Sequence, residues 1–142
     1  MRALLAWLIL IAPAWAAFPE TVDREALAAL KMRIEAGDAA GARIELLAAD
    51  GASPGDADIL NLLGYASRKL GDLDASRTYY QRALRIDPGH RGALEYFGEL
   101  ELQAGDVAAA RDLLARLGAV CPDGCEELDD LREAFAARGL SP

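Results

Sequence analysis

The sequence predicts an all-α fold, an α-solenoid of three helix pairs followed by a capping helix. Two observations support this prediction. A Gly-Asp pair occurs at residues 37–38, 71–72 and 105–106, and a proline occurs at residues 54, 88 and 122, so both features return every 34 residues. A fixed period of this length indicates a repeat architecture in which neighbouring units stack and bury a continuous core.

Residues 1–16 are predicted to be a signal peptide rather than part of this fold. Arg2 provides the positive start, and Leu4–Ala12 is an apolar run shorter than the roughly 20 residues that span a bilayer. Ala14-Trp15-Ala16 then offers the small-x-small pattern of a cleavage site. An uncleaved anchor or a buried N-terminal helix is the alternative. We therefore expect a periplasmic or secreted protein, with residues 17–22 as a short linker.

The repeat domain is predicted to span residues 23–139, with units at about 23–56, 57–90 and 91–124. In the middle unit, small and apolar residues follow the i, i+3, i+4, i+7 spacing of an amphipathic helix: Leu60, Leu63, Gly64 and Ser67. Gly71 breaks this helix, and Asp72 is suited to cap the next one by accepting from exposed backbone N–H groups. Pro88 ends the second helix, because proline lacks the N–H that a continuing helix needs.

A capping helix is predicted over residues 123–138. Asp123 and Glu126 have the spacing of a capping box, in which each side chain accepts from the other residue's backbone N–H. One apolar stripe is formed by Leu128, Leu131 and Phe135. A repeat stack needs such a helix, because its last unit would otherwise expose an apolar face.

These residues resemble the tetratricopeptide repeat family. The stretches that carry the resemblance are Leu60–Gly64, Gly71–Leu73, Tyr79–Leu84 and Ile86–Pro88, and the likeness extends over roughly residues 23–124. The resemblance implies a superhelical stack with a concave groove, lined by the first helix of each unit, that binds a peptide or a helix of another protein.

On the matching positions, the resemblance implies these groove residues: Lys31, Asn61, Leu62, Tyr65, Arg68, Lys69, Glu95, Tyr96, Glu99 and Leu102. Arg68, Lys69 and Tyr96 are predicted to grip the partner, so that reversing the charge of Arg68 and Lys69 should weaken capture and leave the fold intact. For Tyr65 and Tyr96, packing between repeats is the alternative. Family members that grip chaperone carboxylate tails use groove lysines, asparagines and arginines. Several of those places here hold Leu27, Leu62, Gly92 and Tyr96.

The two cysteines, Cys121 and Cys125, allow two interpretations. Residues one helical turn apart lie about 6 Å from each other, within the range of a disulfide, and an oxidising compartment favours the bond. The bond would fix the angle at which the last helix docks. The alternative is a reactive or metal-binding pair, which gives a second hypothesis for the whole protein, a thiol- or metal-handling factor in metalloprotein or envelope assembly. His90 is interpreted as a solvent-facing turn residue rather than a third ligand.

Composition excludes several other classes of function. The formal net charge is -8, which disfavours binding to nucleic-acid phosphates. A single histidine and two cysteines provide little for a metal centre or a catalytic triad, and no glycine-rich phosphate loop is present. We therefore expect a non-enzymatic protein that uses no cofactor, is a monomer and has another protein as its partner.

Overall fold

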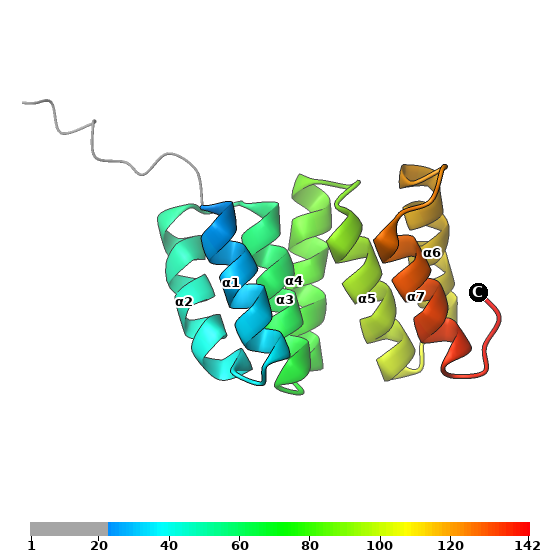
Figure 1. Ribbon diagram of the computed structural model, residues 1–142, viewed down its shortest axis with the longest axis horizontal. Helices are drawn as coiled ribbons and strands as arrows, with labels where there is room; N and C mark the ends of the chain where they lie inside the picture. Colours follow the sequence, from blue (N-terminus) through cyan, green and yellow to red (C-terminus); the bar gives the residue numbers. More distant parts are fainter. Residues whose placement is uncertain (1–22) are drawn as a thin grey trace, which may run out of the picture.

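The computed structural model describes residues 23–142, and within them the chain forms seven α-helices and no strand (Figure 1). The helices are α1 (Arg24–Glu35), α2 (Ala39–Ala52), α3 (Ala57–Lys69), α4 (Leu73–Ile86), α5 (Arg91–Ala104), α6 (Val107–Val120) and α7 (Glu126–Ala136). The predicted all-α class is confirmed. The predicted signal peptide and linker, residues 1–16 and 17–22, lie outside the described residues.

The repeated Gly-Asp pair makes the turn inside each helix pair. Its glycine has a positive φ, between 81° and 99°, at Gly37, Gly71 and Gly105. This left-handed conformation ends the first helix and strains any residue that carries a Cβ. The aspartates that follow, Asp38, Asp72 and Asp106, each accept a hydrogen bond from the backbone N–H three residues later. The pair therefore stops one helix and starts the next.

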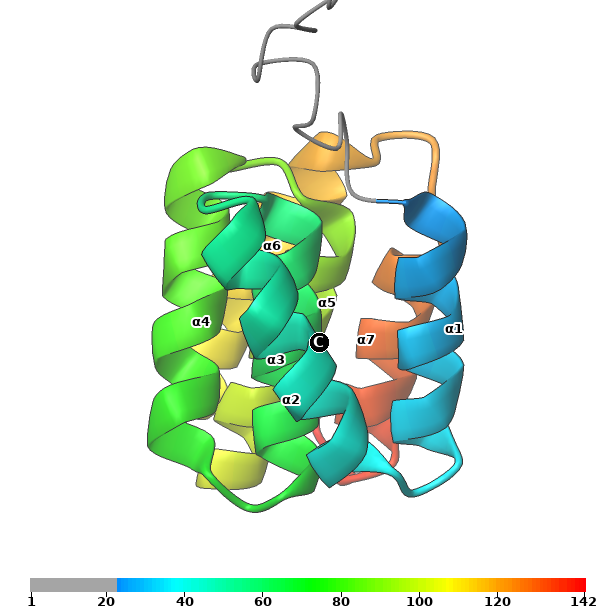
Figure 2. The same ribbon diagram turned by 90° about the vertical axis from the view of Figure 1, so that its left-hand side faces the viewer.

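The helices stack in two rows. Seen along the stack, α4 lies at the left edge, α1 and α7 lie at the right, and α3 and α5 lie between them (Figure 2). We call α1, α3, α5 and α7 the inner helices and the other three the outer helices. Contacts between helix backbones join α1 to α3, α3 to α5 and α5 to α7, whereas α1 and α7 do not contact each other. The inner helices therefore form a concave surface with α3 and α5 as its floor.

Two glycines let the floor helices approach their neighbours closely. A Cβ on Gly64 would lie 2.5 Å from the Tyr80 ring of α4, and one on Gly98 would lie 2.7 Å from Leu131 of α7. The Ser76 hydroxyl also donates to the Gly64 carbonyl at 2.8 Å, which joins α3 to α4 at the same point. These contacts explain why small residues stand inside helices that would otherwise favour alanine or leucine.

Helix α7 covers the end of the stack with its apolar stripe, since Leu128, Leu131 and Phe135 are all buried. The predicted capping box is wrong. Cys125 is the N-cap, in an extended conformation and without a side-chain capping bond, and the helix begins at Glu126. Asp123 lies two residues before the N-cap, so it is too far upstream to accept from the first helical turn. Within residues 23–142, no helix has the length and apolar character needed to cross a membrane.

Candidate functional site

We call the concave surface between α1 and α7 the groove, and all the predicted groove residues lie on the inner helices. Lys31 lies on α1, the α3 residues are Asn61, Leu62, Tyr65, Arg68 and Lys69, and the α5 residues are Glu95, Tyr96, Glu99 and Leu102. Most of them form the floor and are buried or half-buried, whereas Lys31 and Lys69 are exposed. Most of these residues are therefore packed against their neighbours, whereas the cationic side chains of Lys31 and Lys69 extend into solvent.

Two stacked tyrosines join the second and third repeats at the centre of the floor. The rings of Tyr65 and Tyr96 are 4.7 Å apart between centroids and nearly parallel. The Arg68 guanidinium lies 5.5 Å from the centroid of the Tyr65 ring, Lys69 lies 5.3 Å from the same ring, and Lys31 lies 5.9 Å from that of Tyr96. Burial raises the pKa of both tyrosines. Packing between repeats therefore accounts for much of the contact surface of these tyrosines, although Tyr96 is only partly buried.

Arg68 is bound within the floor. Its Nη2 lies 2.5 Å from a carboxylate oxygen of Glu99, and only 12% of its side chain is exposed. A glutamate at position 68 would bring a second carboxylate against Glu99 where little water could screen the repulsion. Charge reversal at Arg68 is therefore expected to destabilise the fold as well as to affect capture, whereas Lys69 is exposed and suits such a test.

Several polar groups in the floor lack a partner among the described residues. Asn61 is 7% exposed, and its Oδ1 is buried without a hydrogen bond, as is the Nε of Arg68. Glu95 is 6% exposed, and its carboxylate makes no hydrogen bond or ion pair with residues 23–142. Burial raises the pKa of Glu95 to about 8, with further contributions from the negative charges of Glu99 and Asp130. The floor therefore retains unsatisfied polar groups, which is unusual in the interior of a folded protein.

Two small hollows lie along the groove. The first has a volume of about 210 Å³ between α1 and α3 and is lined by Arg24, Leu27, Ala28, Lys31, Asp58, Asn61 and Leu62. The second has a volume of about 280 Å³ between α5 and α7 and is lined by Glu99, Asp130, Glu133, Ala134 and Ala137. The first is apolar with a mainly basic rim, and the second is acidic with an alanine floor. The two sides of the groove, beside α1 and beside α7, therefore differ in charge.

Sequence reasoning missed the acidic residues of α7. Asp130 and Glu133 were not predicted, because residues 123–138 were interpreted only as a capping helix. A signal was present, since Asp130, Glu133, Ala134 and Ala137 follow the i, i+3, i+4, i+7 spacing of one helix face. This face is separate from the one that carries Leu128 and Leu131.

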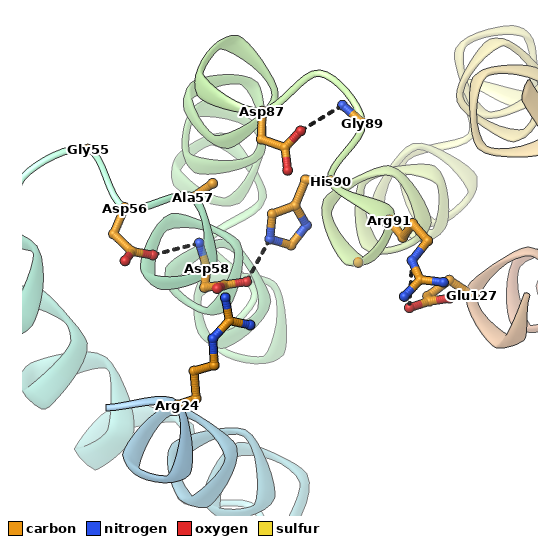
Figure 3. Close-up of a pocket in the computed structure, with 11 residues that line it drawn as sticks. Arg24, Gly55, Asp56, Ala57, Asp58, Asp87, Gly89, His90, Arg91 and Glu127 are labelled. Carbon is orange, nitrogen blue, oxygen red and sulfur yellow. Dashed lines mark hydrogen bonds and ion pairs between the residues drawn. The ribbon is translucent and has the colours of Figure 1, made fainter. Parts of the chain in front are cut away.

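A wider polar hollow of about 580 Å³ lies at the N-terminal ends of the inner helices (Figure 3). At its centre, His90 Nε2 lies 3.0 Å from Asp58, and His90 Nδ1 accepts from the Ala93 N–H at 3.1 Å. Arg24 extends from α1 toward Asp58 in Figure 3. The interpretation of His90 as a solvent-facing turn residue is wrong, because the imidazole caps α5 and only 12% of the side chain is exposed.

Cys121 and Cys125 are joined by a disulfide, with their Cα atoms 5.9 Å apart. Neither cysteine is a free thiol. In the part of the chain that the structure describes, no group of three or more histidine, cysteine or acidic side chains is arranged to hold a metal ion. The bond ties the end of α6 to the start of α7. The thiol- or metal-handling hypothesis stays a prediction without a supporting observation.

Comparison with known proteins identifies the repeat. A family model described as tetratricopeptide repeat matches residues 57–90. Cellulose synthase 2 operon protein C of Komagataeibacter xylinus is 33% identical over 104 residues, which are 72% of this chain but only 8% of that protein. The chain therefore spans a small part of the length of this curated relative.

Two solved structures share the fold. One is the first TPR of Spaghetti bound to the HSP90 peptide SRMEEVD, with a TM-score of 0.66, 16% identity and coverage of 83% of this chain and 99% of that one. The other is PcrH in complex with the chaperone binding region of PopD, with a TM-score of 0.64, 19% identity and coverage of 84% and 92%. The match of residues 57–90 to the family model, together with the 34-residue period and the helix pairs described above, shows that the chain belongs to the tetratricopeptide repeat family.

Proposed function

We propose that this protein is a non-catalytic adaptor that binds a segment of another protein in the groove. The observation that carries the proposal is the floor of the groove, where buried polar groups lack partners beside two hollows of side-chain size. A bound segment would satisfy these groups and fill the hollows. The similar solved structures support the proposal, since one is bound to an HSP90 peptide and the other is in complex with a region of PopD.

The size and spacing of the hollows favour a polypeptide over a small molecule. Pockets for small ligands usually enclose roughly 300–1,000 Å³ and bury most of the ligand. The hollows beside α1 and α7 are smaller, at about 210 and 280 Å³, and they lie on opposite sides of the tyrosine pair. A segment that crosses the groove could place one side chain in each hollow and lay its backbone over the rings.

The floor is also suited to binding because it is already ordered. Tyr65, Tyr96 and Arg68 hold one another through stacking and cation–π contacts, and Glu99 fixes the guanidinium. A rigid floor loses little conformational freedom when a partner binds, and this raises affinity for a given contact area. Lys31 and Lys69 are left to adjust to the partner from above.

We further propose that the adaptor acts in the periplasm or outside the cell, on the basis of the signal-peptide pattern in residues 1–16. The test is N-terminal sequencing of the protein from separated cell fractions. A start at Ala17 in the exported fraction would support this location, and an intact N-terminus in the cytosolic fraction would contradict it.

The groove itself is tested by photocrosslinking in the cells that make the protein. A photoreactive amino acid replaces Ala28 or Ala137, which line the two hollows, or Ala115, an exposed residue of the outer helix α6 used as the matched control. We expect a discrete crosslinked protein from the groove positions and none from Ala115. Crosslinks from Ala115 alone, or from no position, would contradict the proposal.

A further inference from the structure

Glu95 is a buried acid whose ion-pair partner is absent from the described chain. Another acid on the same helix provides the contrast: Glu101 is 4% exposed, and both of its carboxylate oxygens accept from the Arg77 guanidinium, at 2.8 and 3.0 Å. Glu95 is buried to the same extent, at 6% exposed, and accepts from nothing. Buried carboxylates are rarely left unpaired, because removing the charge from water is costly.

The carboxyl of Glu95 lies within range of charges from both sides of the groove. The charges that act on it come from Lys31 on α1, from Glu99 on its own helix and from Glu127 and Asp130 on α7. Helices α1 and α7 do not contact each other, so a group that lies within range of both occupies the gap between them. A partner segment in the groove would pass this carboxyl.

One helical turn from Glu95 along α5, Glu99 lines an acidic hollow that has room for one long side chain, and Glu95 itself lies outside its lining. Glu99, Asp130 and Glu133 surround a volume of about 280 Å³, and Ala134 and Ala137 keep its floor apolar. Glu99 is paired with Arg68, while Asp130 and Glu133 have no ion-pair partner among residues 23–142. An apolar floor with carboxylates around it suits a basic side chain, whose methylene stem packs below while its cation meets the acids.

We infer that the groove binds a basic side chain of the partner, preferably arginine, which enters between α5 and α7 and pairs with Glu95 and Asp130. Arginine is preferred because its planar guanidinium carries five N–H donors and can pair with two carboxylates from different helices. The inference rests on the proposed function, since it specifies the chemistry of the segment that the adaptor holds.

Two internal explanations of Glu95 fit the structure less well. Lys31 is the nearest cation of α1, but its ammonium pairs with Glu35 at 3.8 Å and lies over the Tyr96 ring. A bound metal ion would need at least three grouped ligands, and no such group exists in residues 23–142. A basic side chain of a partner protein therefore accounts best for the unpaired carboxyl of Glu95.

The first test is a selection of random twelve-residue peptides, displayed on phage, against the purified protein. We expect peptides that bind the wild type to be enriched in arginine and lysine. The enrichment should be lost with Glu95→Gln and weakened with Asp130→Asn, both of which keep the size of the side chain. Glu126→Gln is the matched control, because Glu126 is an exposed acid of α7 that lines none of the hollows.

The outcomes separate this inference from the proposed function. Peptides without basic residues, or basic peptides that bind Glu95→Gln as well as the wild type, would overturn the inference and leave the adaptor intact. Failure to recover any binding peptide would overturn both.

A second measurement reads the ionisation of Glu95 directly. Calorimetric titration of a recovered arginine peptide, repeated at pH 7 in buffers of different ionisation enthalpy, gives the number of protons released on binding. Because the pKa of Glu95 in the free protein is about 8, the group is mostly protonated at pH 7. Pairing with a guanidinium should therefore release close to one proton, and Glu95→Gln should release none. No release from the wild type would contradict the inference.

Discussion

The two sides of the groove occupy matching places in the stack but differ in charge and in origin. Helix α1 belongs to a complete helix pair and presents Lys31, whereas α7 follows the last pair and presents Asp130 and Glu133. Both helices also bury an apolar stripe against the floor helices. A helix that covers the end of a repeat stack can therefore also supply one half of a binding surface, because its two functions use different faces.

The attachment of the two sides also differs. Both helices bury an apolar stripe and make an ion pair, Arg33–Glu45 at 2.6 Å for α1 and Arg91–Glu127 at 3.7 Å for α7, but only α7 also has a disulfide, through Cys125 to Cys121. Helix α7 has 11 residues, and isolated helices of that length are marginal in water, so its packing against α5 and α6 has to stabilise it. The position of the acidic side thus depends on the buried face of α7.

The largest effect is expected from Phe135→Ala, which removes the largest buried side chain of α7. Loss of this ring should cost about 3–5 kcal/mol of the free energy of unfolding, from lost burial and the cavity left behind. Urea titration followed by circular dichroism measures it, with the exposed neighbour Ala136→Ser as control. A loss no larger than that of the control would show that α7 is not held by its core.

Glu95→Gln should change how stability depends on pH. The pKa of Glu95 in the folded protein is about 8, above the ordinary value of 4.5. The contribution of this group to the stability of the wild type is therefore full below about pH 4.5 and is lost as the pH rises toward 8. Between pH 5 and 7 the wild type should lose about 2–3 kcal/mol relative to the variant. Parallel urea titrations at both pH values measure the difference, and identical pH profiles would contradict the assigned pKa.

Replacing both cysteines, Cys121→Ser with Cys125→Ser, should have a smaller effect. Closing so short a loop constrains the unfolded chain by about 2 kcal/mol in the chain-entropy model. The difference between the variant and the oxidised wild type is measured by thermal unfolding, and the reduced wild type should match the variant. If reduction has no effect on the wild type, the disulfide does not contribute to holding the acidic side.

The smallest effect on stability is expected from Lys69→Glu, which changes a charge at the end of the floor helix α3. Lys69 is exposed and makes no ion pair among the described residues, so the free energy of unfolding should change by no more than about 0.5 kcal/mol. Binding of a selected peptide should nevertheless change, as measured by fluorescence anisotropy. A large loss of stability would show that Lys69 supports the floor as Arg68 does.

The fold could be predicted from the sequence because its determinants are local and repeated. Each Gly-Asp pair acts within a few residues, through one positive φ and one capping bond, and the 34-residue period then repeats the same result. The start of α7 was predicted less well. There the extended backbone at Cys125 makes that residue the N-cap, and the spacing of Asp123 and Glu126 gave no sign of it.

For the candidate site, the resemblance to the family indicated groove residues on the first helices, including Glu95 and Arg68, but not their ion pairing. Whether such a residue is free or paired depends on contacts between repeats, such as the one from Arg68 to Glu99, and no pattern within one repeat reveals them. The position of Asp130 beside the groove could not be predicted for a similar reason, since it depends on how α7 packs against α5.

The most direct test of the account is an NMR titration of the Glu95 side-chain carboxyl, followed by its ¹³Cδ shift, with and without a recovered arginine peptide. We expect a midpoint near pH 8 in the free protein and a midpoint at least about one pH unit lower when the peptide is bound, since a cation favours the carboxylate. A free-protein midpoint near the ordinary value of 4.5, or one that saturating peptide does not move, would contradict the claim that Glu95 awaits a basic side chain.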